Sequence, residues 1–235
     1  MNRGRRGWIV VALVLCIGLF FEAVSAQADT FDLVGWNDPN LRVEVTFDVS
    51  QVTHSSLTYQ RVDVTIKNSS INESDPRLTG FAFNLPDAIF GFIAFGGPSF
   101  WGTMVDRHNI GTPEPLGKFD VAAITGPNFS GGDPNFGIPV GQTGSFYWEW
   151  SPSSLPNFTP QDFLGLLSAG GQNDVPQYFA ARFQRTGLDG KGSDVAVPGE
   201  GLMRVPEPET IVLLGIALVA FAVYGLYMRK KRKIK

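Results

Sequence analysis

Cysteine is almost absent from this sequence of 235 residues. The single cysteine, Cys16, lies in an apolar run near the N-terminus, directly after Leu15, where a lipoprotein signal needs a small residue. The rest of the chain therefore forms no disulfide, holds no thiolate zinc site and has no cysteine nucleophile. Its stability has to come from buried side chains.

Histidine is nearly as scarce, because His54 and His108 are the only two. Neither has a second histidine near it in the sequence, so each is interpreted as a structural or surface residue. The sequence also contains no G-x-S-x-G, H-E-x-x-H, P-loop or G-x-G-x-x-G motif. We therefore expect no enzymatic activity, no cofactor and no metal site.

Basic residues are few before the C-terminus. Residues 29–204 hold 19 acidic and 10 basic side chains, a net charge of −9. Binding to nucleic acid needs clustered Lys and Arg that displace counterions from phosphates, and this stretch has no such cluster. The composition therefore disfavours nucleic acid, and we expect no nucleic-acid partner.

The N-terminus has the three regions of a secretory signal peptide. Arg3, Arg5 and Arg6 precede an uncharged run over residues 7–21, and small residues follow up to Ala28. Cleavage by signal peptidase after Ala26 or after Ala28 satisfies the small-residue rule, and the second position is preferred. The alternative, an uncleaved anchor, is disfavoured because the apolar run is shorter than the roughly 20 residues that span a bilayer.

The C-terminus predicts a transmembrane helix. Residues 211–228 form an uncharged stretch of 18 residues, rich in Leu, Ile, Val and Ala. Positive charge flanking one end of a membrane helix places that end in the cytoplasm, so everything before residue 211 is expected outside the inner membrane. The flanking basic residues are Arg229, Lys230, Lys231, Arg232 and Lys233.

A short proline-rich motif, Val205, Pro206, Glu207 and Pro208, stands immediately before this helix. Together with the apolar helix and the basic tail, it resembles the PEP-CTERM sorting signal, although Glu209 occupies a position where that family usually has Ser. The resemblance covers about the last thirty residues. It implies that exosortase, an integral-membrane enzyme, recognises and processes this segment; the alternative is a permanent single-pass anchor.

The region between the two ends predicts an all-β fold. Apolar and polar residues alternate with period two, which is typical of half-buried strands, and Gly, Pro and Asn turns separate the segments. About eight strands suit a sandwich or a jelly-roll-like domain. The expected strands lie within residues 41–49, 62–66, 81–85, 89–95, 119–124, 146–150, 179–183 and 194–197.

One short helix is expected among the strands. Thr159 is the predicted N-cap, Pro160 occupies the first turn, and the apolar residues continue to Leu167 before Gly170 and Gly171.

A glycine-rich segment, residues 189–194, resembles a calcium loop in composition. Lys191 occupies a ligand position there, so a hairpin turn is favoured.

Trp148, Glu149 and Trp150 suggest a carbohydrate contact, because indole rings stack on sugars and a carboxylate accepts hydroxyl hydrogen bonds. The alternation instead places Phe146, Trp148 and Trp150 on one strand face, so the simplest interpretation is that these rings form core. Sugar stacking requires the two tryptophans to be exposed.

These features divide the chain into a signal peptide (1–28), a β-rich ectodomain (29–197), a linker (198–204) and a sorting signal (205–235). We expect a non-catalytic protein that passes the secretion translocon, is held in the inner membrane during sorting, and reaches the cell surface or extracellular matrix. The alternative function is a carbohydrate-binding module, associated with exopolysaccharide and delivered by the same route.

Overall fold

The computed structural model describes residues 28–71, 75–89, 91–112, 116–151, 158–170 and 175–199. Residues 1–27 and 200–235 lie outside the described residues, and with them lie nearly all of the predicted signal peptide and the whole predicted membrane helix. Among the helices that the structure does describe, none has the length and apolar character needed to cross a membrane.

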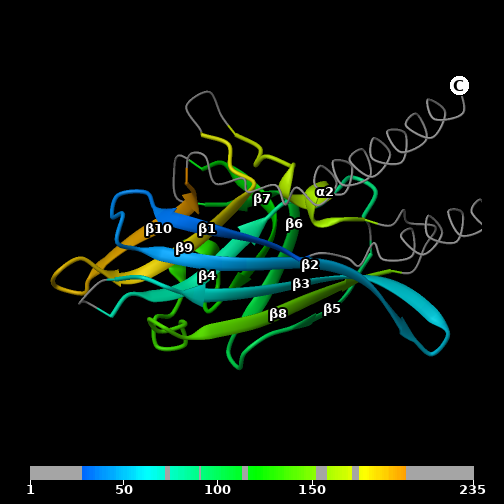
Figure 1. The fold of residues 1–235 in the computed structure, drawn as a ribbon, viewed down its shortest axis with the longest axis horizontal. Coiled ribbons are helices and arrows are strands. Elements are labelled where there is room, and N and C mark those ends of the chain that lie inside the picture. The colour runs from blue at the N-terminus through cyan, green and yellow to red at the C-terminus, as the bar shows by residue number, and fades with distance from the viewer. Residues whose placement is uncertain are drawn as a thin grey trace, which may run out of the picture. The chain divides into compact units, whose positions relative to one another are not determined.

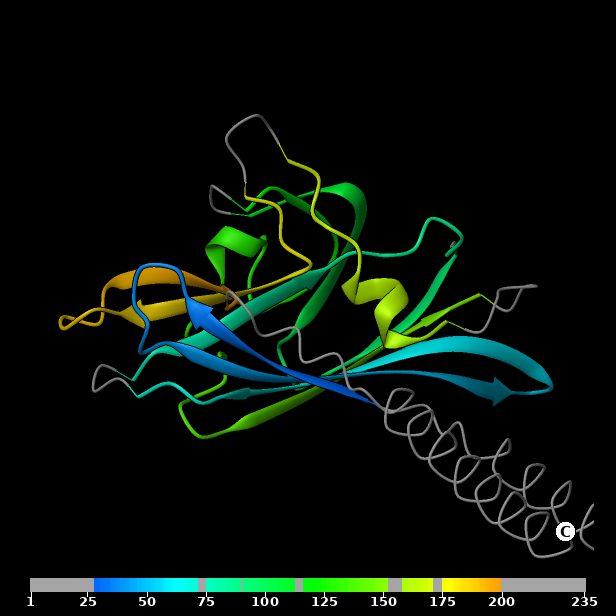
Figure 2. The ribbon, with the colours of Figure 1, turned by 45° about the horizontal axis from the view of Figure 1, so that its top comes forward.

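Strands make up most of the described chain, which forms an all-β domain with one short α-helix (Figure 1). The longest strands, β2 and β3, form a hairpin that extends past the ends of its neighbours in both views (Figures 1 and 2). The strands are β1 (Asp29–Gly35), β2 (Arg42–His54), β3 (Leu57–Asn68), β4 (Arg77–Phe83), β5 (Phe92–Gly96), β6 (Gly102–Gly111), β7 (Lys118–Ile124), β8 (Thr143–Trp150), β9 (Phe179–Thr186) and β10 (Gly192–Pro198).

All of these strands belong to one 10-stranded sheet, in the order β5-β8-β3-β2-β1-β10-β9-β4-β7-β6. Every neighbouring pair is antiparallel. Strand β1 joins the two halves, because it pairs with β2 along one edge and with β10 along the other. The prediction of an all-β domain with one short helix is confirmed, and its strands form one continuous sheet.

The sheet curls until its two halves face each other. Phe83 of β4 packs edge-on against Phe47 of β2 and Trp148 of β8, with ring centroids 5.4 and 5.2 Å apart. Neither β2 nor β8 is next to β4 in the sheet, so these contacts cross the interior. A short loop, residues 97–101, connects the two edge strands β5 and β6 and brings the edges near each other. The sheet is therefore nearly closed.

Alternation decides which side chains fill the interior. In β2, Val43, Val45, Phe47 and Val49 are buried, while the residues between them face solvent at least in part. In the other half, the outer face is also apolar and carries a second buried cluster. That cluster contains Ala82, Ile110, Leu116, Phe119, Ala122, Ile124, Phe129, Ala180, Val195 and Val197.

Each of the eight predicted strands overlaps an observed strand, and β1 and β6 were not predicted. Strand β1 does alternate, with Phe31 and Leu33 facing the core, but it begins at the expected cleavage position. Strand β6 gives no period-two signal, because Ile110 is its only buried residue and its pairing with β7 is interrupted between Val105 and Ile110. The eight predicted strands do not include β1, which joins β2 to β10 in the single sheet.

The predicted helix is present as α2, residues Pro160–Leu164, with Thr159 as its N-cap. Its first turn is stabilised because the Asp162 carboxylate accepts hydrogen bonds from the Thr159 amide at 2.7 Å and from the Thr159 hydroxyl at 2.9 Å. The helix ends earlier than predicted. Ala169 pairs with Lys118 of β7, which draws the following segment into an extended conformation and leaves Leu167 exposed.

Candidate functional site

The two predicted motif regions lie outside the described residues. These are the sorting motif Val205, Pro206, Glu207 and Pro208, and the membrane-flanking residues Arg229, Lys230, Lys231, Arg232 and Lys233. The remaining predicted residues, Trp148, Glu149 and Trp150, all lie on β8 and can be placed.

Trp148 and Trp150 belong to the core. Their exposed fractions are 0% and 1%, and Phe146, on the same strand face, is also buried. Trp148 packs against Phe83 and Phe95, which surround the indole with other rings. The interpretation of these residues as core is confirmed. Neither indole offers a face to a sugar, so the carbohydrate contact suggested for Trp148, Glu149 and Trp150 is not supported.

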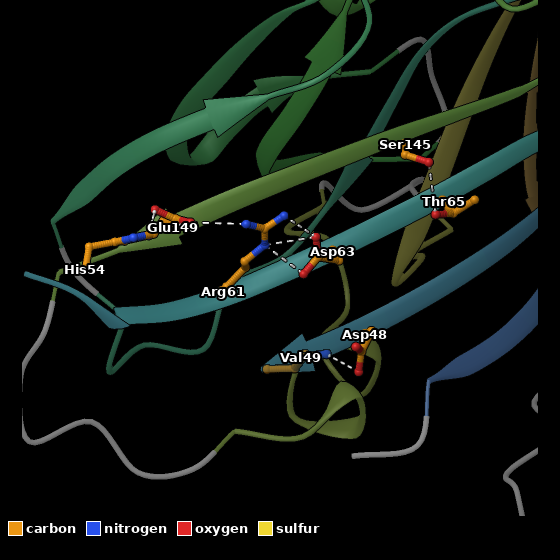
Figure 3. Close-up of polar contacts among 8 residues, drawn as sticks. All are labelled: Asp48, Val49, His54, Arg61, Asp63, Thr65, Ser145 and Glu149. Carbon is orange, nitrogen blue, oxygen red and sulfur yellow. Dashed lines mark hydrogen bonds and ion pairs between the residues drawn. The ribbon is translucent and has the colours of Figure 1, made fainter. Parts of the chain in front are cut away.

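Glu149 points to the opposite side of β8 and is the centre of a polar cluster on the outer face of β2, β3 and β8 (Figure 3). Only 8% of its side chain is exposed. Its carboxylate lies 3.3 Å from Nε2 of His54 and accepts a hydrogen bond from Nη1 of Arg61, also at 3.3 Å. Two positively charged or protonatable groups therefore cover the buried carboxylate.

Arg61 links Glu149 to a second carboxylate and to an aromatic ring. Its Nε and Nη2 donate to Asp63 at 2.8 to 3.0 Å, and its guanidinium carbon lies 4.0 Å from the centre of the Tyr147 ring. The hydrogen bonds to Asp63 raise the pKa of the Arg61 guanidinium, outweighing the opposite effect of burial. The Tyr147 ring in turn lies over Gly96, where a Cβ would come within 2.1 Å of it.

Strand register brings these residues together. Arg61 stands opposite Glu149, and Asp63 stands opposite Tyr147, in the β3–β8 pair. Beside them runs a row of hydroxyl side chains from four adjacent strands: Thr30, Thr46, Thr65 and Ser145. The outer hydroxyl pairs of the row, Thr30 with Thr46 and Thr65 with Ser145, are separated by 3.3 and 3.4 Å. The sequence analysis did not predict this polar cluster, because its residues come together only through the pairing of β3 with β8.

His108 forms a second histidine–carboxylate pair. Its Nδ1 lies 3.1 Å from Oδ1 of Asp120, which is fully buried. The same carboxylate accepts hydrogen bonds from the backbone amides of His108, at 2.6 Å, and Leu85, at 2.8 Å. Asp120 thus holds the irregular stretch of β6 against the segment that follows β4.

Both buried carboxylates are hydrogen-bonded within the fold, Glu149 to Arg61 and Asp120 to the backbone amides of Leu85 and His108. Over the described ranges, no group of three or more His, Cys, Asp or Glu side chains is placed to hold a metal ion. The segment around Lys191 is a hairpin turn, as predicted, with Gly187 and Gly190 at positive φ and Asp189 accepting from the Lys191 amide.

Comparison of the chain with known protein families, with curated protein sequences and with solved structures finds no match in any of the three.

Proposed function

We propose that this chain is a non-catalytic surface or extracellular-matrix protein that exosortase sorts and processes through a PEP-CTERM signal. The observation that carries the proposal is the order of three parts at the C-terminus. Val205–Pro208 comes first, the uncharged stretch of residues 211–228 follows, and the basic residues 229–233 complete it. A chance Pro-Glu-Pro is common, whereas the three parts in this order are not.

The chemistry of the motif supports recognition by a membrane enzyme. Pro206 and Pro208 cannot continue a regular helix, and the residue before each proline is biased to extended backbone. We therefore expect Glu207 in an extended segment before the proposed membrane stretch, where a membrane-embedded enzyme could bind it. These residues are a substrate of another enzyme and have no catalytic role of their own.

The described domain is compatible with this role. Its buried apolar residues pack inside the curled sheet or in the cluster on its outer face, and its buried carboxylates are hydrogen-bonded within the fold. We propose that it is a sandwich-like ectodomain between a signal peptide (1–28) and a transmembrane helix (211–228). The chain would pass the translocon, lose the signal peptide to signal peptidase, remain in the inner membrane until exosortase acts, and then reach the surface.

Mass spectrometry of the protein recovered from the outer surface tests the proposal. Sorting and cleavage predict a mature protein that lacks residue 211 onward. An intact C-terminus through Lys235 would instead identify a permanent anchor and overturn the exosortase step. N-terminal peptides from the same sample show whether the mature chain begins at Gln27 or at Asp29.

A carbohydrate-binding module delivered by the same route is the second candidate function. The core position of Trp148 and Trp150 removes its original basis. A different pair of aromatic rings, exposed at the surface, favours it.

A further inference from the structure

Two phenylalanine rings, Phe100 and Phe136, stack on each other at the surface. Their centroids are 4.2 Å apart, and the angle between their planes is 20°. Phe100 is 70% exposed and Phe136 is 40% exposed. Large apolar rings in contact with water lower stability relative to polar residues, so a paired, exposed arrangement points to a binding role.

The backbone that presents these rings is strained. Phe100 has φ of 71° and Arg185 has φ of 59°. This left-handed conformation is disfavoured for residues other than glycine. Both strained residues meet one loop, residues 133–137, since Phe100 stacks on Phe136 and Arg185 contacts Asn135. Strain of this kind persists where the surrounding structure enforces it, and it concentrates at functional sites.

Hydrogen bonds hold both loops in place before any ligand arrives. Nε1 of the buried Trp101 donates to the Phe136 carbonyl at 3.0 Å and ties the two loops together. Asp133 accepts from the Asn135 amide through its carboxylate and from the Phe136 amide through its carbonyl. A rigid platform loses little conformational entropy on binding, which favours affinity.

A cation is hydrogen-bonded to the loop that carries Phe136. Nη2 of Arg185 donates to Oδ1 of Asn135 at 2.7 Å, one residue from Phe136 along the loop. Among the residues that the structure describes, no carboxylate lies within ion-pair distance of Arg185. Its positive charge is therefore available to an anionic group bound beside the rings.

We propose that Phe100, Phe136, Asn135 and Arg185 form a binding site for an acidic polysaccharide. The apolar C–H face of a pyranose would pack on the exposed rings, and a sugar carboxylate would pair with Arg185 while Asn135 binds a hydroxyl. Two rings are too small a surface for a stable protein interface, which buries about 800 Å² on each partner. The inference deepens the second candidate function and does not depend on the sorting signal.

Affinity electrophoresis of the full chain in detergent micelles tests the site. The gels contain polygalacturonate, a polymer of hexuronic acid, or the neutral glucan amylose. We expect retardation by polygalacturonate, and Phe136→Ala lowers the affinity about tenfold, the equivalent of a lost stacking contact. Arg185→Gln removes the preference for the acidic polymer. Leu57→Ala is the matched control, because Leu57 is 52% exposed and lies at the tip of the β2–β3 hairpin, outside these loops.

Phe100→Gly separates a binding role from a structural one. Glycine adopts positive φ without strain, so this variant should melt at the same temperature as the original chain or higher while binding is lost. A lower melting temperature with unchanged binding would overturn the proposal. Migration unaffected by either polymer would overturn both the site and the second candidate function, whereas retardation by amylose alone would overturn only the acidic class. None of these outcomes alters the C-terminal mass that tests sorting.

Discussion

The indole Nε1 of Trp148 donates a hydrogen bond to Oγ1 of Thr103 at 2.8 Å. Trp148 lies on β8 and Thr103 on β6, which are near opposite ends of the sheet. The bond therefore connects the two margins of the curled sheet across the interior. Trp148 consequently fills the core and also holds the two margins of the sheet together.

Replacing Trp148 with Ala should lower the free energy of unfolding by about 3 to 5 kcal/mol, because a fully buried ring leaves a large cavity. Urea unfolding followed by far-ultraviolet circular dichroism measures the change. Trp36→Ala is the control and should have little effect, since Trp36 is 42% exposed. An equal effect of the two substitutions would show that Trp148 is not a core residue.

A fragment spanning residues 29–201 should be soluble and folded without either terminal segment. Its buried apolar residues pack inside the sheet or in the second cluster on its outer face, and its net charge is strongly negative. Size-exclusion chromatography and circular dichroism check this expectation. Aggregation of cleanly expressed fragment, with no β-sheet signal, would contradict it.

Tyr178 should limit stability at alkaline pH. Burial raises the pKa of Tyr178 from 10.0 to about 12, and its ring packs edge-on against Phe31. Because the folded pKa lies above the unfolded one, the contribution of Tyr178 to stability is complete below about pH 10 and falls as the pH rises toward 12. Tyr178→Phe should match the original chain at pH 7 and be more stable at pH 11. Denaturant unfolding of both proteins at the two pH values measures this difference. An equal loss of unfolding free energy in both proteins at pH 11 would show that Tyr178 is not the group responsible.

The tip of the β2–β3 hairpin offers a stabilising change. Ser55 and Ser56 connect paired His54 and Leu57 and have φ of 48° and 72°. Two positive φ values are typical of a type I′ turn, which prefers Asn-Gly. The double change Ser55→Asn and Ser56→Gly should raise the free energy of unfolding by about 0.5 to 1 kcal/mol. Ser56→Val should lower it, because a β-branched side chain opposes positive φ; the reverse order would exclude this turn type.

Changing Pro206, Glu207 and Pro208 together to Ala should block C-terminal processing. Alanine favours helix where proline forbids it, so the proposed membrane helix could extend through the motif and remove the proposed extended segment. The uncut protein should stay in the inner membrane, as fractionation and mass spectrometry would show. Lys67→Ala, an exposed change in the ectodomain, is the control and should leave processing intact. Normal processing of the triple variant would mean that the motif is not recognised.

Several parts of the fold followed from local pattern alone. Alternation over residues 41–49 predicted both the position of β2 and its buried face, and the Thr159–Pro160 signal predicted the start of α2. The lengths were less predictable. Strands β2 and β3 extend well beyond their apolar alternation, because hydrogen bonding between them continues to the hairpin tip.

The polar cluster around Glu149 and the stacked pair Phe100 and Phe136 both depend on contacts between residues far apart in the chain. Arg61 and Glu149 meet because β3 pairs with β8, although 88 positions separate them in the chain. Phe100 and Phe136 meet because the Trp101 indole, at the end of the loop that carries Phe100, hydrogen-bonds the loop that carries Phe136. Neither contact could be predicted from neighbouring residues, since each of the four residues is, by local pattern, an ordinary strand or loop residue.

The sequence by itself determined the composition limits, the period-two strands and the three-part order of the C-terminal segment, because these depend on neighbouring residues along the chain. The alternation also favoured Trp148 and Trp150 as core residues, whereas only the tertiary structure decided that Phe100 and Phe136 are exposed and stack on each other. Burial is set by which strands face each other across the curled sheet. That depends on β1, which joins its sequence neighbour β2 to β10, a strand far from it in the chain.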